Sequence, residues 1–264
     1  MASALITGAS SGIGKELARL FAERKYDLIL LARSKDKLKN IKKELEEKYL
    51  INCELVVFDL SNTNNIKDFE AIIKNFDCEI LINCAGFGEI KKFDDLSIER
   101  ELSMLNVNLL SPIILTRLFL EKNIKNQDNI NREITIINIC STAALYLHPY
   151  MTMYSTTKRG LLNYSLSLSE ELKNRNKNIH LLSICPGPTA TPFFEESTKE
   201  KFGSFKLWEM STEVVAKEII NCFDKKKRFG IIGFRNKILA KFVAMLPINF
   251  QLKMVAKHLK NAVK

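Results

Sequence analysis

The sequence predicts an α/β fold of three layers, in which a doubly wound parallel sheet lies between two layers of helices. Two observations support this prediction. Short apolar segments alternate with longer segments of helical periodicity, an order typical of parallel strands joined by crossover helices. The apolar segments are continuous, as expected of strands that helices cover on both faces. No repeat or linker interrupts this order, so we predict a single domain.

The first strand–helix–strand unit indicates a phosphate site. A strand at 3–7 precedes a helix at about 13–24, and a strand at 27–32 closes the unit. The turn between the first strand and the helix contains three glycines: Gly8, Gly12 and Gly14. The N-terminus of a helix offers unpaired N–H groups to a phosphate, and glycine lets a ligand approach the backbone. The spacing is GxxxGxG and not GxGxxG, so an ordinary glycine turn stays an alternative.

The remaining segments continue the alternation. Further strands are expected at 53–58, 79–83, 133–139, 180–184 and 229–232. Further helices are expected at about 35–48, 63–75, 98–123, 152–174 and 212–224. The stretch 189–210 has no clean period.

Composition favours a globular protein of the cytoplasm. Of 264 residues, 46% are hydrophobic and 27% are charged. No uninterrupted apolar stretch reaches the length of a membrane span, and a strand at the very N-terminus leaves no room for a signal peptide. The six cysteines form no CxxC pair and the three histidines are scattered, so we expect reduced, buried cysteines and no metal site.

The positive charge is concentrated near the C-terminus. The net charge is +10, and the segment from Lys225 onward has eleven Lys or Arg and no Asp or Glu, so the preceding 224 residues sum to −1. The basic character therefore belongs to this segment and not to the predicted sheet domain.

Chemically distinctive residues follow the predicted strands. Ligands of parallel sheets bind beyond the carboxyl ends of the strands, which lie at one edge. The residues at these positions are Gly8 to Gly14, Arg33 and Ser34, Asp59 and Leu60, Asn83 to Gly86, Cys140 to Thr142, and Pro186 to Phe193. We therefore expect one ligand site along this edge.

Tyr154 and Lys158 suggest proton transfer at the same edge. They are four residues apart and face the same way on the predicted helix. A nearby ammonium stabilises a phenolate, so we expect Lys158 to lower the pKa of Tyr154 toward neutral pH. A solvated helix edge is the alternative for this pair taken alone.

Over roughly residues 3–235, the chain resembles the short-chain dehydrogenase/reductase family. The matching motifs are TGASSGIG at Thr7–Gly14, Asp59, NCAG at Asn83–Gly86, Asn108, Ser141, YSTTK at Tyr154–Lys158 and PGPTAT at Pro186–Thr191. The family usually has NNAG, so Cys84 is a departure, at a position whose side chain is not catalytic in the family.

The resemblance implies a Rossmann-type fold and hydride transfer between a nicotinamide cofactor and a carbonyl carbon. It makes Tyr154 the general acid or base and Ser141 a hydrogen-bond donor to the substrate oxygen. It makes Lys158 a ligand of the nicotinamide ribose, and Asn108 the holder of a water that links Lys158 to solvent. The roles of Ser141 and Tyr154 are physically reasonable, because hydroxyl donors stabilise the negative charge that develops on the substrate oxygen.

The resemblance also implies a set of cofactor-binding residues, with Thr191 at the carboxamide and Asp59 at the adenine. The full set is Gly8, Ser10, Ser11, Gly12, Ile13, Gly14, Arg33, Asp59, Leu60, Asn83, Ala85, Gly86, Tyr154, Lys158, Pro186, Gly187, Thr189 and Thr191.

Arg33 favours NADP(H) as the cofactor. Proteins that bind NAD usually carry an acidic residue after the second strand, and this chain has Arg33 there. A guanidinium can grip a 2′-phosphate with two hydrogen bonds, and Ser10 and Lys37 could assist. The alternative is that Arg33 stacks on adenine or is solvated. Asp36 is expected to cap the next helix at its N-terminus or to interact favourably with the dipole of that helix.

The expected substrate is a hydrophobic ketone, aldehyde or alcohol. An apolar, aromatic set occupies the positions where the family builds its pocket and lid: Leu145, Tyr146, Leu147, Pro149, Phe193, Phe194, Phe202, Phe205 and Trp208. His148 is expected to be a bystander. The aromatic cluster could equally be the core of the lid.

We divide the chain into the domain 1–235, with a lid at about 189–210, and a basic helical extension at 236–264. The extension has apolar stripes with lysines opposite, which favours two helices packed on the domain or on another subunit. Contact with an anionic membrane surface is the alternative, and nucleic-acid binding is not expected. The resemblance implies a homodimer or homotetramer through the helices at 98–123 and 152–174. A cofactor-binding sensor or scaffold without turnover is the other functional hypothesis.

Overall fold

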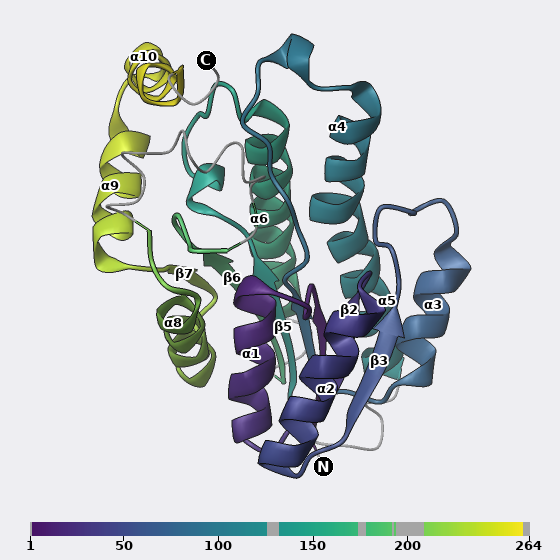
Figure 1. Ribbon diagram of the computed structural model, residues 1–264. Helices are drawn as coiled ribbons and strands as arrows, with labels where there is room; N and C mark the ends of the chain where they lie inside the picture. The colour runs from purple at the N-terminus through teal and green to yellow at the C-terminus, as the bar shows by residue number, and fades with distance from the viewer. Residues whose placement is uncertain (1, 126–131, 174–177, 192, 194–208, 261–264) are drawn as a thin grey trace.

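The fold is a parallel sheet between two layers of helices, as the sequence predicts (Figure 1). The computed structural model describes residues 2–125, 132–173, 178–191, 193 and 209–260. Seven parallel strands lie in the order β3-β2-β1-β4-β5-β6-β7. They are β1 Ser3–Thr7, β2 Asp27–Ala32, β3 Cys53–Val57, β4 Ile80–Asn83, β5 Ile134–Ile139, β6 Ile179–Cys185 and β7 Phe229–Ile231.

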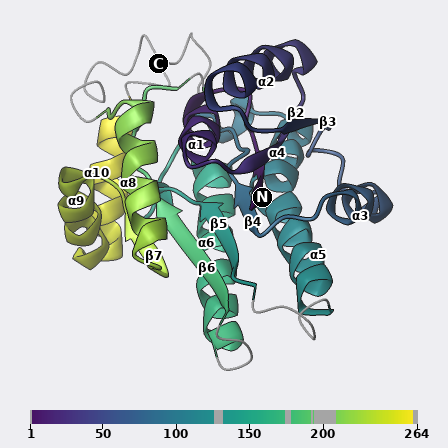
Figure 2. The same ribbon diagram turned by 90° about the horizontal axis from the view of Figure 1, so that it is seen from below.

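Helices cover both faces of the sheet (Figure 2). One face carries α1 Gly12–Glu23, α2 Lys35–Tyr49 and α8 Thr212–Asp224. The other carries α3 Ile66–Asn75, α5 Ser111–Lys125 and α6 Thr152–Lys173, and α4 Ile98–Leu105 packs against α6. The extension forms α9 Phe234–Met245 and α10 Ile248–Leu259 beyond the β7 edge. Short 3₁₀ turns occur at Phe93–Asp95 and Thr142–Ala144.

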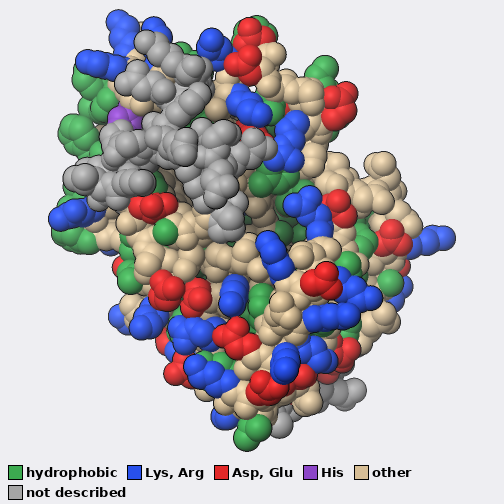
Figure 3. All heavy atoms as spheres, viewed as in Figure 1, with side chains coloured by type: hydrophobic (Ala, Val, Ile, Leu, Met, Phe, Trp, Pro, Cys, Tyr) green, Lys and Arg blue, Asp and Glu red, His purple; other side chains and the backbone are tan. Residues whose placement is uncertain are grey.

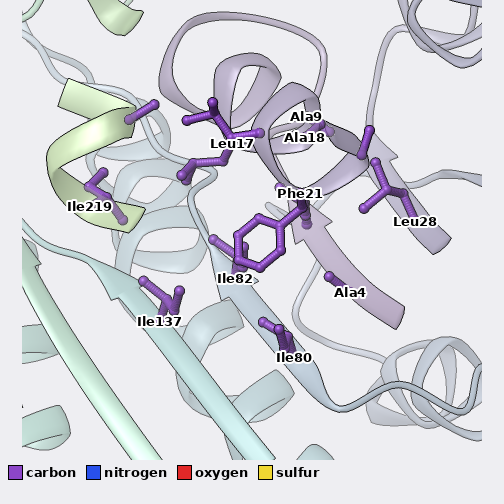
Figure 4. Packing of buried hydrophobic residues seen from close by; sticks show 14 of the residues in the cluster. Ala4, Ala9, Leu17, Ala18, Phe21, Leu28, Ile80, Ile82, Ile137 and Ile219 are labelled. Atoms are coloured by element: carbon purple, nitrogen blue, oxygen red, sulfur yellow. The ribbon is translucent and has the colours of Figure 1, made fainter. Parts of the chain in front are cut away.

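Successive strand residues face opposite layers. Ile6 of β1 packs in the cluster under α1 and α8, whereas its neighbour Leu5 packs in the cluster under α3 and α5. Phe21 of α1 is fully buried and points at the sheet beside Ile82 (Figure 4). The strand interiors are thus taken up by packing, and the predicted site residues lie in the loops that follow the strands.

The helix predicted at 98–123 contains an irregular turn. A π-helical segment, Asn106–Leu110, separates α4 from α5. This segment holds Asn108, which is fully buried. Such π turns often occur at functional sites, and no periodicity in the sequence reveals this one.

Of the described residues, the helix Ile98–Ile124 has the length and mean hydropathy, 1.4, that a membrane span requires. The sequence argument missed it because Arg117 interrupts the apolar run. Leu115 and Phe119 of this helix are buried in the core cluster under the sheet. Since these side chains are packed in the core, the length and composition of the helix alone do not show that it spans a membrane.

Candidate active site

The turn between β1 and α1 is a cradle that only glycine can form. Gly8 has φ +69° and Gly12 has φ +55°, which are values that other residues rarely adopt. A Cβ at Gly8 would lie 2.8 Å from the Cα of Ala85, and one at Gly14 would overlap the carbonyl oxygen of Gly8. Bare backbone therefore faces the start of α1, as a phosphate site requires.

The loops after β4 and β6 pack against this turn. The Thr7 hydroxyl accepts hydrogen bonds from the backbone N–H groups of Cys84 and Ala85, both at 3.0 Å. A Cβ at Gly12 would lie 2.9 Å from the side chain of Thr191. The loops after β1, β4 and β6 are thus brought together, and the predicted residues Ser10, Ser11, Ile13 and Thr191 lie at one edge.

Ser141 and Tyr154 interact at this edge of the sheet. Ser141 follows β5, and its Oγ accepts the backbone N–H of Ala143 at 3.1 Å. The hydroxyl proton of Ser141 is thus free to donate, and the interaction of Ser141 with Tyr154 lowers the pKa of the phenol. Tyr154 lies in the first turn of α6 and is only 7% exposed.

Lys158 is buried one turn further along α6. The residue is 3% exposed, and its ammonium donates to the carbonyl oxygen of Ile139 at 2.9 Å. Within the described chain this carbonyl is its one hydrogen-bond acceptor, although an ammonium has three protons to donate. A Cβ at Gly86 would lie 3.2 Å from this nitrogen. The ammonium and the bare Gly86 backbone together fit a ligand with hydroxyl groups.

Asn108 locks the loop after β4 in place. Its Oδ1 accepts the Phe87 N–H at 3.0 Å, and its Nδ2 donates to the Phe87 carbonyl at 2.8 Å and to the Thr157 hydroxyl at 3.2 Å. Both ends of the amide are therefore used, and Asn108 joins the loop to α6. Its predicted role of holding a water that links Lys158 to solvent stays a prediction.

The expectation that Lys158 lowers the pKa of Tyr154 toward neutral pH is wrong for the protein without a bound ligand. Burial raises the pKa of the phenol well above its usual value, and the hydrogen bond with Ser141 only partly opposes that effect. Burial also lowers the pKa of Lys158, since a buried ammonium loses its hydration. Lys158 does not offset the desolvation of Tyr154, so the phenol is the protonated form at neutral pH.

The side chain of Asn83 lies in the core, and the predicted contact of this residue with a cofactor stays a prediction. Its amide is 2% exposed and donates to Asn138 at 2.8 Å and to Thr116 at 3.2 Å. The side chain thus joins β4 to β5 and α5 inside the core. Only the backbone of Asn83 remains for a cofactor, because the side chain points away from the edge.

The rest of the predicted cofactor set lies along the edge with few internal partners. Arg33 is exposed directly after β2, and in the described residues no carboxylate pairs with it. Asp59 accepts the N–H of Ser61 at 2.9 Å, next to the buried Leu60. Asp36 lies in the first turn of α2 without capping it.

Hydrogen bonds also hold the loop after β6. The Thr142 N–H donates to the Pro186 carbonyl oxygen at 2.8 Å, and the Thr189 hydroxyl donates to the Gly187 carbonyl oxygen at 3.0 Å.

Apolar side chains surround Tyr154. Phe193 packs edge-on against its ring, with centroids 5.4 Å apart. Tyr146 packs against the same cluster and stacks on His148 at 4.4 Å. Of the other predicted pocket residues, Phe194, Phe202, Phe205 and Trp208 lie outside the described residues, as does most of the predicted lid.

Comparison with known proteins decides the family. The family model described as short chain dehydrogenase matches residues 2–201. The chain belongs to this family. A short-chain dehydrogenase is an oxidoreductase.

Several curated short-chain dehydrogenases resemble this one. A very-long-chain 3-oxoacyl-CoA reductase of Anas platyrhynchos is 30% identical over 75% of this chain and 65% of its own length. The Rattus norvegicus protein of that name is 27% identical over 99% and 83%. An uncharacterized oxidoreductase of Bacillus subtilis is 32% identical over 71% and 68%. This chain thus spans just under two thirds of the duck relative.

Solved structures of short-chain dehydrogenases share the fold. One from Sphingobium yanoikuyae in complex with NADPH has a TM-score of 0.79 at 23% identity, over 100% of this chain and 97% of that one. A 4-hydroxyisoleucine dehydrogenase complexed with NADH has a TM-score of 0.75 at 24% identity, over 88% and 97%. These two structures hold different nicotinamide cofactors, NADPH and NADH.

Sequence reasoning missed three parts of this short-chain dehydrogenase site. Thr7 and Thr157 fall within recognised motifs, but only the structure reveals their hydrogen bonds. The third part is α10, whose Val255 and Leu259 belong to the apolar cluster around Tyr154. Helical periodicity predicted that the extension packs through one side, and it could not predict what that side meets.

Proposed function

We propose that this protein reduces a hydrophobic ketone or aldehyde with NADPH, and oxidises the corresponding alcohol in reverse. The observation that carries the proposal is that the phenol of Tyr154, which interacts with Ser141, is buried within an apolar cluster. Two hydroxyls that converge there can both donate to a carbonyl oxygen. Such donors stabilise the negative charge that develops on the oxygen during reduction.

Tyr154 is the proposed general acid. The nicotinamide supplies the hydride to the carbonyl carbon when it is bound. Burial keeps the phenol of Tyr154 protonated at neutral pH, so its proton is available for the substrate oxygen. Ser141 orients that oxygen and stabilises the charge on it.

Lys158 supports both binding and proton transfer. Its ammonium has free donors beside Gly86 that suit the ribose hydroxyls of the cofactor. The same positive charge stabilises the phenolate that Tyr154 becomes after donating its proton. Asn108 acts through the loop and α6, which it holds together.

The NADP(H) preference rests on Arg33. Its guanidinium is exposed after β2 and is free of carboxylates in the described chain, so it can pair with a 2′-phosphate. A carboxylate at this position would instead favour the ribose hydroxyls of NAD.

The proposed substrate carries its carbonyl on a long apolar chain. The cluster around Tyr154 combines Phe193, Tyr146 and the inner face of α10, which suits an acyl chain or a ring system. The names of the avian and rat relatives describe 3-oxo groups on very long acyl chains, which are ketones of this kind.

The test is oxidation of NADPH with a panel of ketones and aldehydes of increasing chain length. Wild type should turn over the longer members faster. Tyr154→Phe should lower kcat by at least about 100-fold, because general acid catalysis contributes that much. Tyr164→Phe, on the same helix, is the matched control and should retain activity.

The alternative is a cofactor-binding sensor or scaffold. Tight NADPH binding with no turnover on the whole panel would favour that alternative. Equal activity of wild type and Tyr154→Phe would remove Tyr154 from the mechanism.

A further inference from the structure

The outer face of α9 is apolar and has no cover in the described structure. Asn236, Ala240 and Val243 form its buried side. At 100° per residue, Phe234, Ile238, Phe242 and Met245 fall on the opposite side. They are 78%, 54%, 59% and 84% exposed. A helix that is apolar on both sides, with one side packed, has an unused hydrophobic face.

The apolar surface continues through the turn into α10. Ile248 is 65% exposed and Phe250 is 57% exposed. Gln251 fixes the turn, because its buried amide donates to the carbonyl oxygens of Leu246 at 2.8 Å and Ala244 at 3.4 Å. The "apolar ridge" is Phe234, Ile238, Phe242, Met245, Ile248 and Phe250. Figure 3 shows hydrophobic side chains on the surface over α9 and α10, beside Lys and Arg.

Positive charges flank the apolar ridge. Arg235 lies on one side of the α9 face, and Lys237 and Lys241 lie on the other, all exposed. The outer side of α10 carries Lys253 and Lys257. No described carboxylate forms a salt bridge with any of these five, and from Lys225 onward the sequence contains no acidic residue.

We propose that the apolar ridge docks on an anionic lipid surface. Exposed large apolar side chains enter the headgroup–acyl boundary while flanking lysines and arginines contact anionic lipids. A second copy of this chain fits less well, because a two-fold contact through the ridge would bring two sets of these cations together. The proposal does not depend on the proposed reaction.

The docked ridge would lie next to the active site. Val255 and Leu259, on the inner side of α10, pack in the apolar cluster of Tyr154. The helix pair therefore has one side at the catalytic cluster and the other at the lipid. A lipid-borne ketone would have a short path between the two.

The test is co-sedimentation of the full-length protein with vesicles of phosphatidylcholine alone, or of phosphatidylcholine with phosphatidylglycerol. Wild type should bind the anionic vesicles, bind the neutral ones less, and dissociate partly at high salt. Phe242→Gln combined with Met245→Gln should reduce the bound fraction severalfold. The matched control is Leu50→Asn, which removes an apolar side chain that is 80% exposed at the far end of α2.

A second comparison tests the charges. Lys237→Gln with Lys241→Gln should weaken binding, whereas Lys39→Gln with Lys43→Gln on α2 should not. Sedimentation velocity of each variant without lipid reports the oligomeric state. Absence of binding to anionic vesicles would overturn the proposal, as would a ridge variant that binds like wild type. A ridge variant that changes oligomeric state without changing vesicle binding would show a subunit interface instead.

Discussion

The side-chain amide of Asn108 closes both backbone hydrogen bonds of Phe87, at 3.0 Å to its N–H and 2.8 Å to its carbonyl oxygen. The loop after β4 is therefore fixed by a residue of the π turn. The same amide reaches Thr157, next to Lys158. The position of the loop and that of α6, which carries Tyr154 and Lys158, are thus coupled through one buried side chain.

Asn108→Asp should damage both stability and activity. The substitution keeps the shape but replaces the donor with an acceptor, facing the Phe87 carbonyl without solvent. Leaving such a group unsatisfied costs about 1–3 kcal/mol of unfolding free energy, and more if it is charged. Chemical denaturation measures this loss. Asn106→Asp is the control, because the Asn106 amide donates to the Ser61 carbonyl at 2.8 Å and the residue is partly exposed.

Gly86→Ala should impair catalysis more than folding. The new methyl group would lie 3.0 Å from Asn108 Oδ1 and 3.2 Å from Lys158 Nζ. It would occupy the space where the ammonium can meet a ligand, so we expect at least a tenfold loss in kcat/KM. In Gly160→Ala the methyl group meets only the flexible side chain of Leu109, and activity should persist. Equal kinetics for both variants would contradict the placement of the site.

His148 should make the protein less stable in mild acid. Burial lowers the pKa of this histidine from 6.5 to about 4. Between these values the unfolded chain binds a proton that the folded chain does not, so the free energy of unfolding falls as the pH falls from 6.5 to 4. His148→Gln should flatten this dependence by at most about 3 kcal/mol. Urea titrations at several pH values measure it, and an unchanged slope would refute the buried neutral histidine.

Phe21→Ala should be among the most destabilising substitutions. The ring is fully buried and meets Tyr26 and Phe223 edge-on, with centroids 5.2 Å and 5.5 Å away. Truncating a buried phenylalanine costs about 3–5 kcal/mol. Phe93→Ala removes the same atoms at a position that is 89% exposed, and should change unfolding by less than about 0.5 kcal/mol.

The sequence predicts the sheet and the site edge well, because both depend on local patterns. Continuous apolar runs fixed the strands to within one or two residues, and glycines marked the turn after β1. The features that the sequence does not reveal are contacts between distant segments. The amide of Asn83 turns into the core toward Asn138 and Thr116, which no local pattern encodes.

The pKa of Tyr154 shows the same limit. Spacing places Lys158 on the same side of the helix, but it does not reveal how deeply the phenol is buried. Desolvation then outweighs the favourable groups nearby. The role of α10 beside Tyr154 was likewise invisible, since periodicity identifies an apolar side without identifying its partner.

The most direct test of the central claim is a binding titration of NADPH and NADH to wild type and to Arg33→Ala. We expect NADPH to bind wild type at least tenfold more tightly, about 1.4 kcal/mol, and the variant to lose that margin. Lys39→Ala, a nearby exposed residue of α2, should keep it. Equal affinity of wild type for both cofactors would contradict the assigned role of Arg33, and failure to bind either would contradict the proposed enzyme.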